Sequence, residues 1–291
     1  MSSNAIESAK PVGLSQENLE GKDRQSVNGQ KQDNPSTREA DSEANRATIS
    51  QEDLSQALAL LGSETLKKQI QAVRKLGEAG EAGRERLADF VRDRMRPEEP
   101  LEPTAAHGCA YQVLYMASVK ESSASASALV EEFPEGLVCP QSDRGIDYGD
   151  LQMLLVRQEY LQADKLTNQK LCAIAGESAV ERKWVYFTEV GQFPLIDLQA
   201  MDILWGLYSE DKFGWSKQRN LWLRLGEDWE RLWIQLQWKS TEGVWTRYPG
   251  EFVWDLDAAP AGHLPLSNQL RGVRTLDSLL RHPAWQFPWK G

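Results

Sequence analysis

Large aromatic side chains are confined to one part of this chain, and this asymmetry constrains the fold more than any other feature. All eleven tryptophans lie at or beyond Trp184, and no Phe, Tyr or Trp precedes Phe90. Aromatic rings supply the largest apolar area per side chain, and flat apolar ligands bind in pockets that such rings line. The sequence therefore predicts that a site for a flat apolar ligand lies in the C-terminal half.

Length and charge limit the architecture and the classes of partner. The chain has 291 residues, 41% of them hydrophobic, with 33 basic and 43 acidic side chains and a pI near 5.0. This length suits two unequal domains and a tail. The acidic balance argues against binding of nucleic acid or an anionic membrane through bulk charge. Between Asp257 and Asp277, however, no acidic residue occurs, and Arg271 and Arg274 form a short cationic window.

Cysteine usage and the N-terminal residues indicate the compartment. Cys109, Cys139 and Cys172 are odd in number and widely separated, which fits neither a disulfide framework nor a clustered zinc site. The sequence contains no apolar segment typical of a signal peptide or a membrane span, and the acidic residues near its start argue against a transit peptide. We therefore expect a cytoplasmic protein.

Periodicity divides the chain into a tail and two helical regions. Residues 1–48 are rich in Ser, Asn, Gln, Glu and Lys, and this composition predicts a disordered tail. Residues 50–140 show helical spacing of apolar residues, which predicts a helical N-terminal domain. Within it, residues 66–95 resemble a helical hairpin of the HEAT or armadillo kind. After a linker rich in turn residues, residues 143–291 are expected to form a second domain.

Polar residues that precede apolar stripes mark helix starts in the second domain. Asp197, Ser216 and Asp228 each stand just before such a stripe, which predicts that they cap three helices. Tryptophans such as Trp205 and Trp222 lie on these stripes, so most of them are expected in the core. Several prolines after Trp238 exclude one long helix from the remainder.

Four ordered motifs carry a specific resemblance. They are DYGDLQMLL, ADKLT, FPLIDLQAMDILW and KFGWSKQRNLW, spread over about residues 145–285. In this order and at these separations they resemble the genomes-uncoupled-four family, porphyrin-binding regulators of magnesium chelatase in chlorophyll synthesis. The upstream helical region and the FPEGLV segment are similar to the N-terminal extension of cyanobacterial members. Trp215 is a departure, since the family usually has phenylalanine there.

The resemblance implies a fold and a function. The fold is all-α, with a HEAT/armadillo-like N-terminal domain followed by a helical, cupped porphyrin-binding core. The function is that of a non-catalytic regulator that binds protoporphyrin IX and magnesium protoporphyrin IX and stimulates magnesium chelatase by contact with its large subunit. The resemblance implies no nucleic-acid partner and leaves open a peripheral contact with the thylakoid membrane.

Two loops supply the candidate ligand contacts. The segment GHLPLSNQLRGVR combines apolar side chains, which could cover the macrocycle, with cations, which could pair with its propionates: Leu264, Leu266, Leu270, Val273, Arg271 and Arg274. The resemblance places the segment WVYFTEVGQFP opposite, with apolar candidates Val185, Phe187 and Phe193. Trp254, beside the first loop, is the tryptophan that we most expect to touch the ligand.

Two other functional classes remain as alternatives. One is a helical protein-interaction scaffold without ligand binding, and the other is an enzyme acting on a bilin. The sequence has no glycine-rich phosphate loop, no nucleophile elbow and no Cys/His cluster, so neither catalytic residues nor metal ligands are predicted. His263 is the histidine nearest the candidate site, but an isolated histidine is usually structural.

Overall fold

The described part of the chain is built from helices. The computed structural model describes residues 51–96, 101–266 and 273–286. Within these ranges, the one strand-like feature is an isolated antiparallel bridge between Lys239 and Trp245, which confirms the predicted all-α class. None of the described helices is long and apolar enough to cross a membrane. The predicted disordered tail, residues 1–48, lies outside the described residues.

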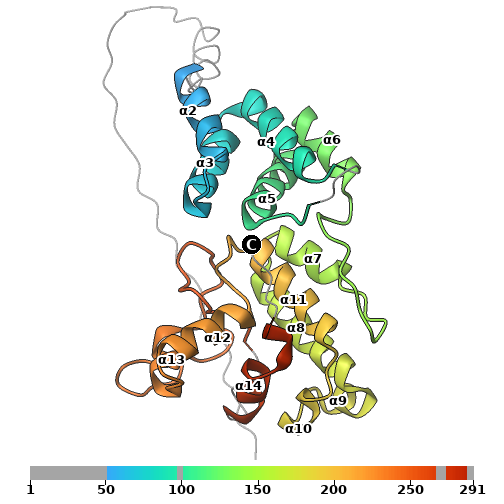
Figure 1. The fold of residues 1–291 in the computed structure, drawn as a ribbon, viewed down its shortest axis with the longest axis vertical. Helices are drawn as coiled ribbons and strands as arrows, with labels where there is room; N and C mark the ends of the chain where they lie inside the picture. Colours follow the sequence, from blue (N-terminus) through green and yellow to red (C-terminus); the bar gives the residue numbers. More distant parts are fainter. Residues whose placement is uncertain (1–50, 97–100, 267–272, 287–291) are drawn as a thin grey trace, which may run out of the picture. The chain divides into compact units, whose positions relative to one another are not determined.

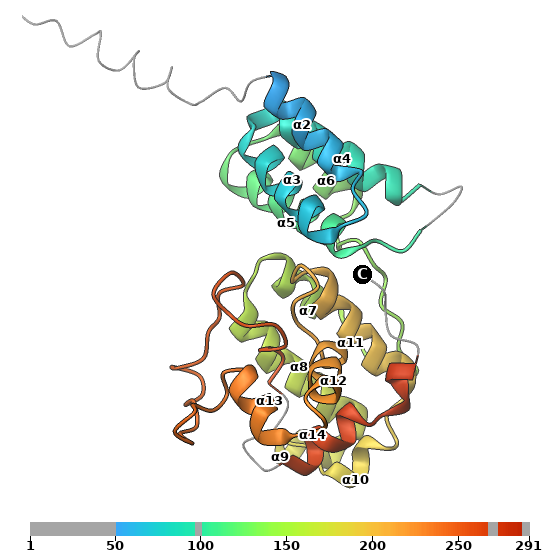
Figure 2. The same cartoon turned by 60° about the vertical axis from the view of Figure 1, so that its left-hand side comes forward.

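The helices fall into two groups along the chain (Figures 1 and 2). The first group consists of α2 (Gln51–Leu61), α3 (Leu66–Glu78), α4 (Gly80–Arg94), α5 (Ala105–Lys120) and α6 (Ala124–Glu132). The second consists of α7 (Gly149–Val156), α8 (Tyr160–Ala175), α9 (Glu177–Arg182), α10 (Phe187–Val190), α11 (Leu195–Leu207), α12 (Trp215–Arg224), α13 (Trp229–Gln235), α14 (Val273–Leu280) and the 3-10 helix η3 (Pro283–Gln286).

Most buried side chains of the first group are small or aliphatic. On α3, Ile70, Val73 and Leu76 form the buried stripe that the sequence predicts. This stripe packs α3 against α2, α4 and α5. The α3–α4 pair is the helical hairpin expected for residues 66–95. Its turn is tight, because a Cβ atom at Gly83 would lie 2.0 Å from the carbonyl oxygen of Leu76.

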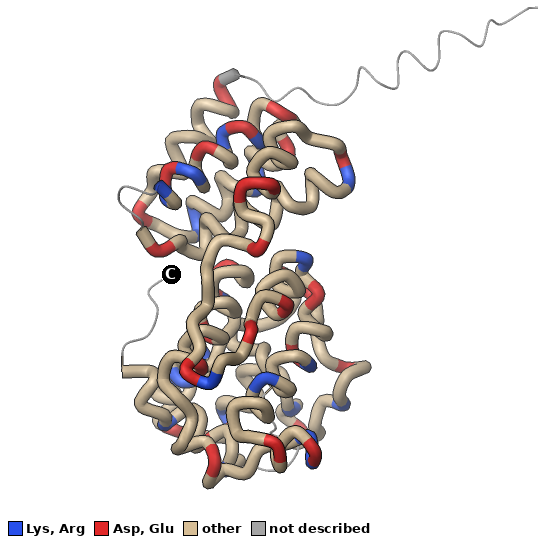
Figure 3. The backbone as a smooth tube through the Cα atoms, turned by 90° about the vertical axis from the view of Figure 1, so that its right-hand side faces the viewer, with Lys and Arg blue, Asp and Glu red and all other residues tan. Residues whose placement is uncertain are grey.

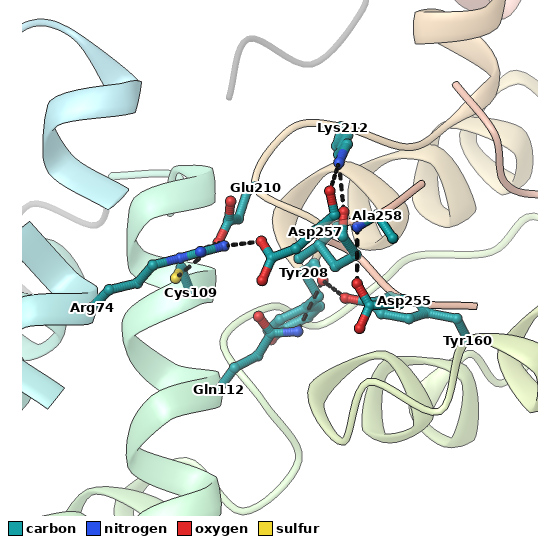
Figure 4. A network of polar contacts seen from close by, with 11 residues as sticks. Arg74, Cys109, Gln112, Tyr160, Tyr208, Glu210, Lys212, Asp255, Asp257 and Ala258 are labelled. Carbon is teal, nitrogen blue, oxygen red and sulfur yellow. Dashed lines mark hydrogen bonds and ion pairs between the residues drawn. The ribbon is translucent and has the colours of Figure 1, made fainter. Parts of the chain in front are cut away.

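Helix α5 connects the two groups. It is buried along most of its length and packs against α3, α4, α6, α7 and α11. Its side chain Gln112 donates hydrogen bonds to the carbonyl oxygens of Leu155 at 2.9 Å and Tyr208 at 2.8 Å. Nearby, Arg74 of α3 reaches both Glu210 at 2.7 Å and Asp257 at 2.6 Å (Figure 4). A buried amide and a half-exposed ion pair therefore join the groups.

The centre of the second group is aromatic. Trp205 of α11 is fully buried, and its indole N–H donates to the hydroxyl of Thr167 on α8 at 3.0 Å. The rings of Tyr160 and Phe213 lie next to the Trp205 ring. The core thus contains Trp205 and Trp222, as helical spacing predicts.

Two of the three predicted helix caps are wrong. Helix α11 begins after Pro194, so Asp197 lies inside its first turn, where its buried carboxylate accepts the Tyr148 hydroxyl at 2.7 Å. Helix α12 begins after Gly214, and the N–H of Ser216 donates to Asp202 at 3.0 Å. In both cases the polar group forms its hydrogen bond with a partner that is distant in sequence. The third prediction is confirmed: Asp228 accepts the N–H of Arg231 at 3.1 Å and caps α13.

Candidate functional site

A cavity with a volume of about 600 Å³ lies in the second helical group. This is within the range of roughly 300–1,000 Å³ that is typical of small-molecule pockets. Side chains from six segments line it: Lys165, Asn168, Gln169, Leu171 and Cys172 of α8; Val180, Lys183, Trp184 and Val185 at and after α9; Val190 and Phe193; Tyr248; Leu266; and Thr275 and Leu279 of α14.

Helix α8 forms one wall of the cavity because one of its faces is buried in the protein and another face lines the cavity. One face carries Tyr160, Ala163, Thr167 and Ile174 into the protein. The lining residues recur at positions 165, 168, 169 and 172, which is the spacing of a single helical stripe. The helix ends at Gly176, whose φ of 109° is a conformation that favours glycine. The chain can therefore turn sharply into α9 and close the adjacent wall.

The wall around α9 and α10 is fixed by stacked aromatic and charged groups. The Arg182 guanidinium lies 5.3 Å from the ring centroid of Trp184 and 4.4 Å from that of Tyr186. Arg182 also pairs with Glu189, which accepts the N–H of Tyr186 at 2.8 Å and so caps α10. These contacts orient Trp184 at the cavity while Val180, 51% exposed, forms part of its rim.

Residues 262–266 form a third wall, a buried segment without regular structure. Gln218 donates to the carbonyl oxygens of Gly262 at 3.0 Å and Pro265 at 2.8 Å. The N–H of Gly214 donates to the carbonyl of Leu264 at 3.0 Å. Buried peptide groups outside helices require partners of this kind, because water cannot reach them. The resulting network fixes the segment whose last residue, Leu266, lines the cavity.

The charge of the cavity is positive. Among its described lining residues, Lys165 and Lys183 are cations and none is acidic. Elsewhere on the described helices, basic and acidic residues are interspersed (Figure 3). The cavity therefore combines apolar walls with ammonium groups that can pair with an anionic substituent of a ligand.

The structure brings three of the sequence-predicted site residues to this cavity, namely Val185, Phe193 and Leu266. Phe187 is exposed outside it, and the Arg274 guanidinium lies 5.4 Å from its ring centroid. Val273 begins α14 and is half-buried.

The other candidates lie elsewhere. Leu264 is fully buried in the third wall and does not line the cavity. Trp254 is half-buried, donates its indole N–H to the carbonyl of Pro249 at 3.0 Å, and contacts the lining residue Tyr248 through its ring. Leu270 and Arg271 lie outside the described residues.

His263, the histidine nearest the candidate site in the sequence, is occupied by backbone contacts. His263 Nδ1 lies 2.6 Å from the carbonyl oxygen of Leu236, and its Nε2 accepts the N–H of Val253 at 3.2 Å. Burial lowers the pKa of His263, which favours this neutral form. Both ring nitrogens are thus engaged. Within the described ranges, no group of three His, Cys, Asp or Glu side chains is placed to hold a metal ion.

Sequence reasoning missed the α8 side of the cavity and Tyr248. The stripe at Lys165, Asn168 and Cys172 was visible as helical spacing, but periodicity does not tell whether such a face meets solvent, core or a cavity. Tyr248 gave no signal, because it lies in a loop that reaches the cavity only through the tertiary fold.

Comparisons with known proteins cover both helical groups. The GUN4-like family model matches residues 141–283, and a model described as an ARM-like repeat domain, GUN4-N terminal, matches residues 45–134. A Ycf53-like protein from Synechocystis sp. is 46% identical over 225 residues, which is 77% of this chain and 93% of that protein.

Two further matches each cover about half of this chain. A chloroplastic tetrapyrrole-binding protein from Arabidopsis thaliana is 44% identical over 142 residues, 46% of this chain and 54% of that protein. The solved structure of GUN4 from Chlamydomonas reinhardtii, 37% identical, covers 52% of this chain and 95% of that one, with a TM-score of 0.48. From the family models and the Synechocystis relative, we conclude that this chain belongs to the GUN4-like family.

Proposed function

We propose that this protein binds a tetrapyrrole in the cavity between α8, α9, α10 and α14, with protoporphyrin IX and magnesium protoporphyrin IX as ligands. The observation that carries the proposal is a cavity of about 600 Å³ with apolar walls, two lysines and no acidic lining residue. A porphyrin is a wide apolar disc with carboxylates at one edge, so it requires this combination. The name of the Arabidopsis relative supports the same class of ligand.

Within this proposal, the lysines receive the propionates. Lys165 and Lys183 come from different walls, so they can contact separate carboxylates or the two ends of one edge. Arg271 and Arg274, predicted from the sequence, remain candidates for the same task. Val185, Phe193, Leu266 and Trp184 supply apolar area for the macrocycle.

A titration tests ligand binding. Protoporphyrin IX, its magnesium form, its dimethyl ester and a bilin are added separately to the full chain, and the Soret band and tryptophan emission are recorded. Both porphyrin acids should shift the band and quench the emission. The dimethyl ester should bind about tenfold more weakly, because it cannot form charge-assisted contacts with the lysines. Absence of both signals with every porphyrin would refute the proposal.

We further propose that the protein acts on magnesium chelatase and catalyses no reaction itself. A protein that holds the porphyrin and contacts the large chelatase subunit raises the local substrate concentration at that enzyme. Stimulation of reconstituted chelatase should therefore be greatest at low porphyrin concentration. Equal chelatase rates with and without the protein across the porphyrin range would contradict this partner.

A further inference from the structure

The backbone of Leu266 is held from both sides by one helix. Its N–H donates to the carboxylate oxygen Oδ1 of Asp164 at 2.6 Å. Its carbonyl oxygen accepts the side-chain amide of Asn168 at 3.1 Å. Asp164 and Asn168 are four residues apart and therefore lie on one face of α8. Leu266 thus sits in a two-point clamp, although it belongs to a segment without regular structure.

The carboxylate of this clamp is inside the protein. Asp164 is fully buried, and burial raises its pKa to about 7, while the Leu266 N–H opposes the rise. Its second oxygen, Oδ2, has no hydrogen bond of acceptable geometry among the described residues. The Tyr248 hydroxyl also lowers the pKa of Asp164.

The arrangement connects Asp164 to the cavity without placing it there. Asp164 is absent from the lining, whereas Leu266 and Tyr248, from two separate loop segments, both line the cavity. Its neighbours on α8, Lys165 and Asn168, line it as well. Burial of a carboxylate costs free energy of folding. Its position next to four lining residues therefore points to a role in shaping the cavity.

We propose that Asp164 is a positioning residue for the ligand, which acts by holding the backbone of Leu266 and, with Asn168, fixes that wall of the cavity. The inference rests on the proposed tetrapyrrole binding and deepens it. Groups that contact a ligand keep productive geometry only when a supporting layer holds them, and Asp164 belongs to that layer. Loss of the clamp lets Leu266 move and weakens binding without removing any atom that touches the ligand.

Asp202 offers a matched control. It is also a buried carboxylate with a pKa raised by burial, and it accepts a backbone N–H, that of Ser216, at 3.0 Å. Neither Asp202 nor Ser216 lines the cavity. Asp202→Ala and Asp164→Ala therefore each remove a buried carboxylate that accepts a backbone N–H, but only the second one should affect the ligand.

The experiment measures protoporphyrin IX affinity of the full chain by the Soret shift, and hydrogen exchange of the Leu266 amide without ligand. Asp164→Ala should weaken binding about tenfold, the range expected for loss of one hydrogen bond to a charged group, and speed exchange at Leu266. Asp164→Asn keeps a side-chain acceptor for the amide and should stay within about twofold of wild type in both readouts. Asp202→Ala should bind with wild-type affinity.

The outcomes separate the inference from the function on which it rests. If wild type binds porphyrin and Asp164→Ala binds equally well, or if Asp202→Ala loses as much affinity as Asp164→Ala, the positioning role is wrong and tetrapyrrole binding stands. If wild type binds no porphyrin, the proposed function is wrong, and unchanged exchange at Leu266 in Asp164→Ala would then show that the clamp is absent too. Should Asp164→Ala fail to fold, Asn168→Ala releases the carbonyl of the same residue. Because Asn168 also lines the cavity, the deciding readout is then hydrogen exchange at Leu266, which should become faster; unchanged exchange would contradict the clamp.

Discussion

The first helical group and the 262–266 wall solve the same problem, burial of the backbone, in opposite ways. In α2 to α6 the helices satisfy their own peptide groups, and close packing relies on small residues such as Gly83 and Gly77. In the wall, side chains from other elements supply the partners, among them Gln218, Asp164 and Asn168. The first region should therefore be sensitive to added volume and the second to lost hydrogen bonds.

The largest effect is expected from an added methyl group in the first region. In Gly83→Ala the new Cβ would lie 2.0 Å from the Leu76 carbonyl oxygen, so the α3–α4 turn must shift. We expect a loss of about 3 kcal/mol in the free energy of unfolding, measured by denaturant titration. Gly62→Ala is the control, because its nearest heavy atom would be 3.7 Å away. Equal transition midpoints for the two variants would contradict the claim that the first helical group is sensitive to added volume.

The wall should respond to loss of donors at nearly constant volume. Gln218→Met leaves the carbonyl oxygens of Gly262 and Pro265 without partners and should lower the free energy of unfolding by about 2–3 kcal/mol. The same replacement at the exposed Gln162 of α8 should change it by less than about 0.5 kcal/mol. If Gln218→Met were as stable as Gln162→Met, the wall would not depend on its polar supports.

The buried Asp164, which supports the wall, should also make the stability of the protein depend on pH. Because the folded pKa of Asp164, about 7, exceeds its usual value, the folded state binds more protons than the unfolded state between about pH 4 and 7. This group's contribution to stability therefore falls as pH rises through that window, by at most about 1.4 kcal/mol per pH unit, and is constant above it. Asp164→Asn should remove this slope, and Asp150→Asn at an exposed position should retain it. Parallel curves for wild type and Asp164→Asn would contradict the assignment.

The smallest effect is expected where the two helical groups meet at the surface. Arg74 pairs with Glu210 and Asp257, but its side chain is 45% exposed. Arg74→Ala should therefore cost less than about 1 kcal/mol, and the difference should vanish in about 1 M salt. Arg86→Ala, which removes only a 3.8 Å contact to Asp89, provides the baseline. A loss above 2 kcal/mol that persists in salt would mean that this ion pair is a major support.

The first region could be predicted from the sequence far better than the wall. Helical spacing located the buried stripe of α3 because a helix satisfies its backbone locally, and the apolar face then decides the packing. The caps at Asp197 and Ser216 were wrong because their partners, Tyr148 and Asp202, are distant in sequence. A local sequence pattern does not reveal these distant partners, so it cannot show that they replace the capping role.

The residues of the cavity likewise divide into those that the sequence could predict and those that it could not. Val185, Phe193 and Leu266 could be selected as apolar residues of two loops, and the structure places them at the cavity. Lys165 and Asn168 could not, because the spacing that puts them on one face of α8 does not reveal what that face meets. The role of Asp164 depends on a bond to a residue about 100 positions later, which only the folded chain brings into contact.

The central claim is that this cavity holds the tetrapyrrole, and Val180→Asp tests it most directly. Val180 lines the cavity and is 51% exposed, so a charge there should leave the fold intact. Val244, 64% exposed and outside the lining, allows the identical replacement as control. In a protoporphyrin titration followed by the Soret band, Val180→Asp should bind at least about tenfold more weakly than wild type, because the macrocycle would bury the new carboxylate. Val244→Asp should match wild type. Equal affinities for all three proteins, with native circular dichroism, would show that the ligand binds elsewhere.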